Sequence, residues 1–265
     1  MKSAPVSTRS MSLLSARACA LVCLAALAVL ALAGLMQSGR SLWQDEATLL
    51  ANLGLPIAQY FDVLPFYDQA APPFALLTLD AAHTIAQGSI TAMRQILLGL
   101  NLAIFASLAL IAYRKSDRAV LLTIAIVALT PLAVRYTVEL KQYGFETLAS
   151  LLFLVALRWF PNRPGAVILL AALLSFFSYS IMLVVGVCVL DALVFRFRGS
   201  LARRWFFLLV AYTLGWLACY LLLFQPATAL QTANYPSAYE RHALSYYVDN
   251  PRLLWRFLVI GRGQA

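Results

Sequence analysis

Charged residues are scarce in this sequence. Only 12% of its 265 residues are charged, whereas 62% are hydrophobic, and a soluble domain of this size carries about twice that charged fraction. Several stretches of 15 to 20 apolar residues follow one another along the chain. This composition excludes a water-soluble single core, a disordered chain and a secreted disulfide scaffold. It predicts an integral membrane protein.

Cysteine motifs, basic clusters and β-barrel patterns are also missing from the sequence. All four cysteines lie inside apolar stretches, without the spacing of a metal site or a disulfide framework. The formal net charge is +9, but the basic residues lie between the apolar runs. Nucleic acid is therefore not an expected partner, because it requires basic residues clustered on one face. No alternating ten-residue pattern predicts a barrel, so the spans are expected to be helical.

The apolar runs predict an all-α polytopic membrane helix bundle with about seven transmembrane helices. The predicted spans cover residues 18–36, 96–113, 119–134, 144–159, 165–179, 180–195 and 205–223. The stretch 167–195 is too long for one crossing of about 20 residues, so a hairpin turn is predicted at residues 178–180. A discontinuous helix broken at the same place is the alternative.

A further run, residues 72–87, begins with two prolines and is interrupted by Asp80 and His83. The positive-inside rule decides where it lies. If it does not cross, twelve Lys and Arg residues before the last loop face the cytoplasm and four face outward; if it crosses, the numbers become six and ten. We therefore expect it to form a juxtamembrane amphipathic helix in the first outer loop.

This topology predicts a single membrane domain over residues 1–265, with outer loops at residues 37–93, 135–143 and 225–265. Nine of the eleven acidic residues fall in or next to these loops. We expect a multi-pass protein of the inner (cell) membrane whose active side faces the periplasm or the cell exterior. The N-terminal run also resembles a signal peptide with a candidate cleavage site after residue 33, but it is long enough to remain as a span.

Two adjacent carboxylates, Asp45 and Glu46, follow the first predicted span, beside Trp43 as an interfacial anchor. A carboxylate near hydrocarbon loses solvation and becomes more basic, which suits a general base for a hydroxyl. On a helix these neighbours project about 100° apart, so they are expected to have different partners. One could act on substrate while the other binds a cation or orients the loop. An ordinary solvated acidic pair is the alternative.

The second outer segment contains Glu139, Lys141 and Tyr143 close together. A cation at the membrane surface is well placed to bind a lipid phosphate, and interfacial anchoring is the alternative. Arg94 lies at the start of the second predicted span, and it too has two interpretations: it binds a lipid phosphate, or its side chain snorkels to the membrane surface.

Two weaker candidates lie in the first outer loop. Gln69 belongs to a polar segment that a rigid double proline follows, which is also compatible with a simple turn. Asp80 and His83 lie three residues apart and share one helical face, but no third ligand is in view. No metal site is therefore expected there.

Taken together, these features resemble the C-type glycosyltransferases of the family-39-like branch, which includes aminoarabinose transferases and protein O-mannosyltransferases. The order and topology of the motifs agree as well as the motifs themselves. Family members are about twice as long, so the chain resembles an N-terminal portion of such a module. The residues that carry the resemblance are Trp43, Asp45, Glu46, Ala47, Gln69, Ala71, Pro72, Pro73, Arg94 and the segment 139–143.

The resemblance implies a membrane glycosyltransferase that moves a sugar from a polyprenyl-phosphate donor to a hydroxyl acceptor on the extracytoplasmic side. Asp45 would be the base that activates the acceptor, and Glu46 would assist it through a metal or through orientation. A divalent cation near this pair is the one cofactor that the resemblance leaves open. Lys141 is the best candidate for the donor phosphate, and the full set of expected donor-binding residues is Lys141, Glu139, Tyr143, Arg94 and Gln69.

The chain also departs from the family pattern. Aminoarabinose transferases tend to have an acidic residue where this chain has Gln69, and the mannosyltransferases carry a large lumenal insertion that this chain lacks. The resemblance therefore predicts the general reaction, and it identifies neither the sugar nor the acceptor.

A non-enzymatic transporter or lipid-handling membrane subunit is the competing interpretation. Its outer carboxylates would bind a cation or a lipid headgroup. Transporters place ionisable groups near the bilayer midplane, whereas few charges fall in the middle of the predicted spans. A further alternative is that this portion is inactive by itself. Membrane lipid is an expected partner in every case, and a polyprenyl-phosphate-linked sugar only for the enzyme.

Overall fold

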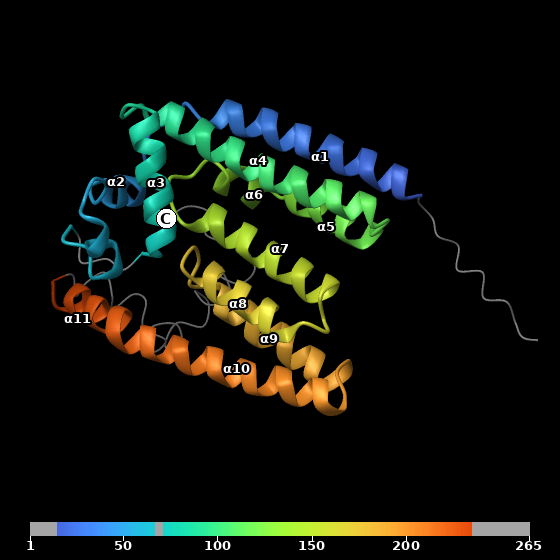
Figure 1. Cartoon of the computed structure of the whole chain (residues 1–265). Coiled ribbons are helices and arrows are strands. Elements are labelled where there is room, and N and C mark those ends of the chain that lie inside the picture. Colours follow the sequence, from blue (N-terminus) through green and yellow to red (C-terminus); the bar gives the residue numbers. More distant parts are fainter. Residues whose placement is uncertain (1–14, 67–70, 235–265) are drawn as a thin grey trace, which may run out of the picture.

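A computed structural model describes residues 15–66 and 71–234 of the chain (Figure 1). Over these residues the secondary structure is helical, and no strand occurs among them. This confirms the all-α prediction. The physical reason is that an apolar segment in lipid must satisfy its backbone hydrogen bonds internally, which a helix does.

Three of the described helices are long and apolar enough to cross a membrane. They are α1 (Ala16–Gln37), α4 (Ile90–Arg114) and α10 (Gly199–Cys219), the last continued by a π-helical turn, η2 (Tyr220–Phe224). At 1.5 Å per residue, the 22 residues of α1 extend over about 33 Å, which matches a hydrocarbon core of about 30 Å. These helices support an integral membrane protein.

The other predicted spans correspond to shorter helices. They are α5 (Arg118–Leu129), α7 (Tyr143–Trp159), α8 (Pro164–Ser175) and α9 (Ile181–Phe195). With 12 to 17 residues each, they fall short of the 20 or so residues that a perpendicular crossing needs. The predicted total of about seven spans is therefore not confirmed, although each predicted span contains a helix.

The predicted span 119–134 is divided in two. Helix α5 ends at Leu129, and a short helix α6 (Pro131–Tyr136) follows. Pro131 has no backbone N–H to continue the hydrogen bonding of α5. The hydroxyl of Thr130 instead caps α6 by accepting a hydrogen bond from the backbone N–H of Ala133 at 3.2 Å. The second outer loop is consequently shorter than predicted, because α6 and α7 include both of its ends.

The break predicted at residues 178–180 is present. Helix α8 ends at Ser175 and α9 begins at Ile181. The two helices pack against each other, so the break is a hairpin turn and not the interruption of one straight helix. The expected outer loop at 225–265 differs, because η2 leads directly into another helix, α11 (Gln225–Asn234). The remainder of that loop lies outside the described residues.

The first outer loop contains α2 (Gln44–Leu50), a 3-10 turn η1 (Ile57–Phe61) and α3 (Pro73–Ile85). In Figure 1, α3 runs across the end of the bundle, whereas the long helices run lengthwise. It begins at the double proline, because proline suits the first turn of a helix. Its Asp80 accepts a hydrogen bond from the backbone N–H of Gly54 at 3.0 Å. The predicted juxtamembrane helix thus corresponds to α3, and Asp80 holds the loop against it.

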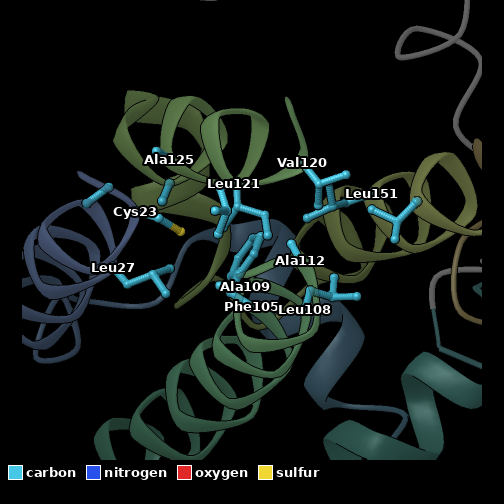
Figure 2. Close-up of a cluster of buried hydrophobic side chains, with 14 of the residues drawn as sticks. Cys23, Leu27, Phe105, Leu108, Ala109, Ala112, Val120, Leu121, Ala125 and Leu151 are labelled. Carbon is cyan, nitrogen blue, oxygen red and sulfur yellow. The ribbon is translucent and has the colours of Figure 1, made fainter. Parts of the chain in front are cut away.

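Three apolar cores hold these helices together. The first joins α1, α4 and α5 with one face of α7, and Figure 2 shows its side chains, among them Cys23 and Phe105. The second lies between α7, α8, α9 and α10. The third lies under the first outer loop and includes Tyr60, Met93 and Leu140. This third core joins the first outer loop to α4 and to the second outer segment, and so positions the candidate site.

The two ends of the bundle differ in their connecting segments. We call the end with residues 38–89, 137–142 and 176–180 the loop end, and the end with residues 115–117, 160–163 and 196–198 the basic end. Contacts at the basic end join its segments, because Arg158 pairs with Asp117 at 2.6 Å and the indole of Trp205 donates to the carbonyl of Pro161 at 3.0 Å. The Lys and Arg residues at or next to these segments are Arg114, Lys115, Arg118, Arg158, Arg163, Arg196, Arg198, Arg203 and Arg204.

Candidate functional site

The start of α2 gives its two carboxylates opposite environments. Trp43 is the N-cap residue, and the side chain of Glu46 reaches back to accept a hydrogen bond from the backbone N–H of Trp43 at 3.0 Å. This turn leaves the side chain of Glu46 0% exposed and that of Asp45 70% exposed. The different partners that helical geometry predicts for these neighbours are thus present.

Glu46 lies at the centre of a buried cluster. Besides the Trp43 N–H, its carboxylate accepts hydrogen bonds from the guanidinium of Arg94 at 2.9 Å and that of Arg40 at 3.1 Å. The backbone N–H of Leu140 donates to it at 2.8 Å. Such charge-assisted hydrogen bonds are the strong ones in proteins. Glu46 therefore joins the first outer loop, α4 and the second outer segment at one point.

Arg94 is held as firmly as Glu46. Its guanidinium donates to the backbone carbonyls of Ser38 at 3.2 Å and Ser41 at 3.3 Å, and also to that of Arg40. Its side chain is 0% exposed. Phosphate contact and snorkelling both need an accessible guanidinium, so neither finds support in this geometry.

Asp45 meets the second outer segment directly. The ammonium of Lys141 donates to its carboxylate at 2.7 Å, although 96 residues separate the two along the chain. Lys141 also lies 5.2 Å from the centroid of the Tyr143 ring, which in turn lies 5.0 Å from the ring of Tyr136. The structure thus brings the predicted base, the predicted phosphate-binding cation and the predicted aromatic residue together.

Glu139 lies beside this cluster and is only 4% exposed. Its carboxylate is 3.7 Å from the guanidinium of Arg135 and 3.9 Å from that of Arg40. Its second oxygen has no hydrogen-bond partner among the described residues. Burial raises the pKa of Glu139 above its usual value, while Arg135 and Arg40 partly oppose that rise.

Sequence reasoning missed two arginines at this site. The guanidinium of Arg135 lies 4.1 Å from the centroid of the Trp43 ring, and that of Arg40 lies 5.8 Å from it. Cation–π contacts of this kind hold the indole in place. Arg135 stands in the second outer segment and could have been singled out for its charge. No pattern in the sequence distinguishes Arg40, because its partners are distant in the chain.

An apolar cavity of about 280 Å³ lies between α8 and α10 at the loop end. Pro73 of α3 lines it, which places it next to the first outer loop. On its wall, Ser175 is 2.7 Å from the hydroxyl of Tyr212 and accepts from the indole of Trp216 at 2.9 Å. These hydrogen bonds join α8 to α10.

Of the predicted site residues, Gln69 alone lies outside the described residues.

A scan against protein-family models, a search of curated proteins and a search of solved structures each found no match for this chain.

Proposed function

We propose that this chain is a membrane glycosyltransferase, or the part of one that holds its base and its donor phosphate. It would move a sugar from a polyprenyl-phosphate donor to a hydroxyl acceptor. The observation that supports this most is the contact of Asp45 with Lys141 at 2.7 Å. An accessible carboxylate and an ammonium from two distant segments meet there, beside the ionic cluster around the buried Glu46 and Arg94, which fixes both segments.

The reaction assigns one step to each of these groups. The carboxylate of Asp45 takes the proton of the acceptor hydroxyl while that oxygen attacks the anomeric carbon. The bond between this carbon and the phosphate oxygen breaks, and polyprenyl phosphate leaves with the electron pair, so the configuration is inverted. Lys141 stabilises the negative charge on the leaving phosphate. Because phosphate is a fair leaving group, most of the catalysis is positioning and charge stabilisation.

The ion pair also predicts the order of binding. In the structure the ammonium of Lys141 donates a hydrogen bond to the carboxylate of Asp45, which has to accept the proton of the acceptor. A donor phosphate competes for the same ammonium, and its binding frees Asp45 for the acceptor hydroxyl. Donor binding therefore precedes acceptor activation.

Glu46 and Arg94 act as positioning residues in this proposal. Their side chains are 0% exposed, and they fasten the start of α2 to the backbone next to Lys141. The divalent cation expected near Asp45 and Glu46 does not fit the residues present, because both oxygens of Glu46 already accept hydrogen bonds and two guanidiniums surround them. Among the described residues, no group of three His, Cys, Asp or Glu side chains could hold a metal. No step is therefore assigned to a metal.

We place the loop end on the extracytoplasmic side of the inner (cell) membrane. The support is the gathering of Lys and Arg at the other end, since such residues favour the cytoplasmic side. The transporter alternative needs ionisable groups midway along spanning helices. In the described helices, Arg94 lies near the start of α4 and Glu146 lies in the first turn of α7, which favours chemistry at the surface.

Transfer from labelled polyprenyl-phosphate sugars in isolated membranes tests the proposal. Asp45→Asn should lower the rate by about 10² to 10⁴, the usual contribution of a general base, with at most a small loss of thermal stability. Asp62→Asn, in the same loop and also exposed, is the matched control and should keep its activity. Transfer at the normal rate by a stable Asp45→Asn protein would refute the role of Asp45. Counterflow of a solute in vesicles without glycosyl product would favour the transporter.

A further inference from the structure

A second cleft lies at the basic end of the bundle, opposite the proposed active site. It has a volume of about 440 Å³ and lies between α5, α7 and α9. Its walls are largely apolar, and Arg158, Asp191 and Arg196 line it at the basic end. The apolar wall residues include Val120, Leu151, Leu154, Val155, Leu157 and Val187.

A polar hollow of about 630 Å³ adjoins this cleft. The two share Ala119 and Arg158 as lining residues, so they lie next to each other at the start of α5. The hollow is lined in addition by Lys115, Asp117 and Arg118. Together the two spaces form an amphipathic site with a charged compartment beyond the ends of the helices and an apolar compartment along their sides.

This site carries more positive than negative charge. Asp117 is engaged by Arg158 at 2.6 Å and by the indole of Trp159 at 3.1 Å. Lys115 and Arg118 form no ion pair among the described residues. Lys115 instead lies over the Trp159 ring, 5.4 Å from its centroid. Two cations in the polar hollow are therefore available to an anion.

We propose that this site binds an anionic phospholipid of the membrane leaflet at the basic end. The phosphate lies in the polar hollow with Lys115 and Arg118, and an acyl chain lies in the cleft between α5, α7 and α9. Charge complementarity selects an anionic headgroup, and the apolar cleft selects a molecule with a hydrocarbon chain. Lys and Arg at a membrane surface favour the leaflet that is rich in anionic lipids. This proposal is independent of the glycosyltransferase proposal.

Binding of phosphatidylglycerol and phosphatidylcholine to the purified full chain in detergent, followed by native mass spectrometry, tests the proposal. The wild-type protein should retain phosphatidylglycerol in preference. The double variant Lys115→Gln/Arg118→Gln should weaken that binding by roughly tenfold or more. Both side chains are exposed, so the variant should fold normally.

Two comparisons separate a specific site from general attraction to positive charge. The double variant Arg163→Gln/Arg204→Gln removes the same charge from another hollow of the basic end and should keep the preference. Leu154→Trp fills the apolar cleft without changing charge and should also weaken phosphatidylglycerol binding. Equal losses in the two double variants, no loss with Leu154→Trp, or displacement of the lipid by inorganic phosphate alone would each overturn the proposal.

Discussion

Removing the carboxylate of Glu46 should destabilise the protein severely. In the structure this group accepts hydrogen bonds from two guanidiniums and two backbone N–H groups, and it is 0% exposed. In Glu46→Ala the buried guanidinium of Arg94 keeps its charge and loses its counter-ion. Breaking a buried ion pair on one side costs about 3–5 kcal/mol. Most of this cost comes from the charge left behind and not from the lost contact.

Thermal unfolding of the purified protein in detergent measures this loss. A change of 1 kcal/mol shifts the Tm of a protein of 150–250 residues by about 2–4 °C. The Tm of Glu46→Ala should therefore fall by roughly 6–20 °C. The matched comparison is Asp45→Asn, whose carboxylate is 70% exposed. Exposed ion pairs contribute about 0–1 kcal/mol, so its Tm should fall by at most about 4 °C.

The two variants also separate structure from chemistry. Asp45→Asn should lose transfer activity while remaining stable, whereas Glu46→Ala should lose both together. A Glu46→Ala protein whose Tm lies within a few degrees of the wild-type value would refute the buried cluster. It would show that Arg94 finds water or another acceptor in solution, and that Glu46 does not fix the two outer segments.

Two further predictions concern the second outer segment and the helices α6 and α7 on either side of it. At Gly144, an added Cβ would lie 2.7 Å from the backbone oxygen of Tyr136, so Gly144→Ala should cost about 1–3 kcal/mol in unfolding free energy. Gly99→Ala, at an open helical position, should be neutral or stabilising by up to about 1 kcal/mol. Equal effects of the two substitutions on thermal unfolding would contradict the close approach of Gly144 to the backbone oxygen of Tyr136. Burial raises the pKa of the Glu139 carboxyl above its usual value, so ionisation of this group opposes folding as pH rises through the folded-state pKa. The Tm of Glu139→Gln minus the Tm of the wild-type protein should therefore increase as pH rises above about 4.5. If this Tm difference stays constant or falls with pH, Arg40 and Arg135 outweigh burial in setting the pKa of Glu139.

Local properties of the sequence correctly predicted most of the secondary structure. The apolar runs predicted the helices, the excess length of the run 167–195 predicted the turn between α8 and α9, and the double proline predicted the start of α3. These features depend on neighbouring residues only. The division of the run 119–134 was missed, although Pro131 was visible in it, because the hydropathy of the run conceals the break. The helix α11 was missed because its polar composition is typical of a loop.

Different partners for Asp45 and Glu46 could be predicted from the sequence, because adjacent residues on a helix point in different directions. Which of the two is buried, and against what, depends on contacts between distant segments. Glu46 pairs with Arg94 across 48 residues and Asp45 with Lys141 across 96. These contacts form only when the third apolar core brings the first outer loop, α4 and the second outer segment together. Composition and helical period contain no information on such packing, and so the tertiary structure alone decided which carboxylate supports the site and which one faces the solvent.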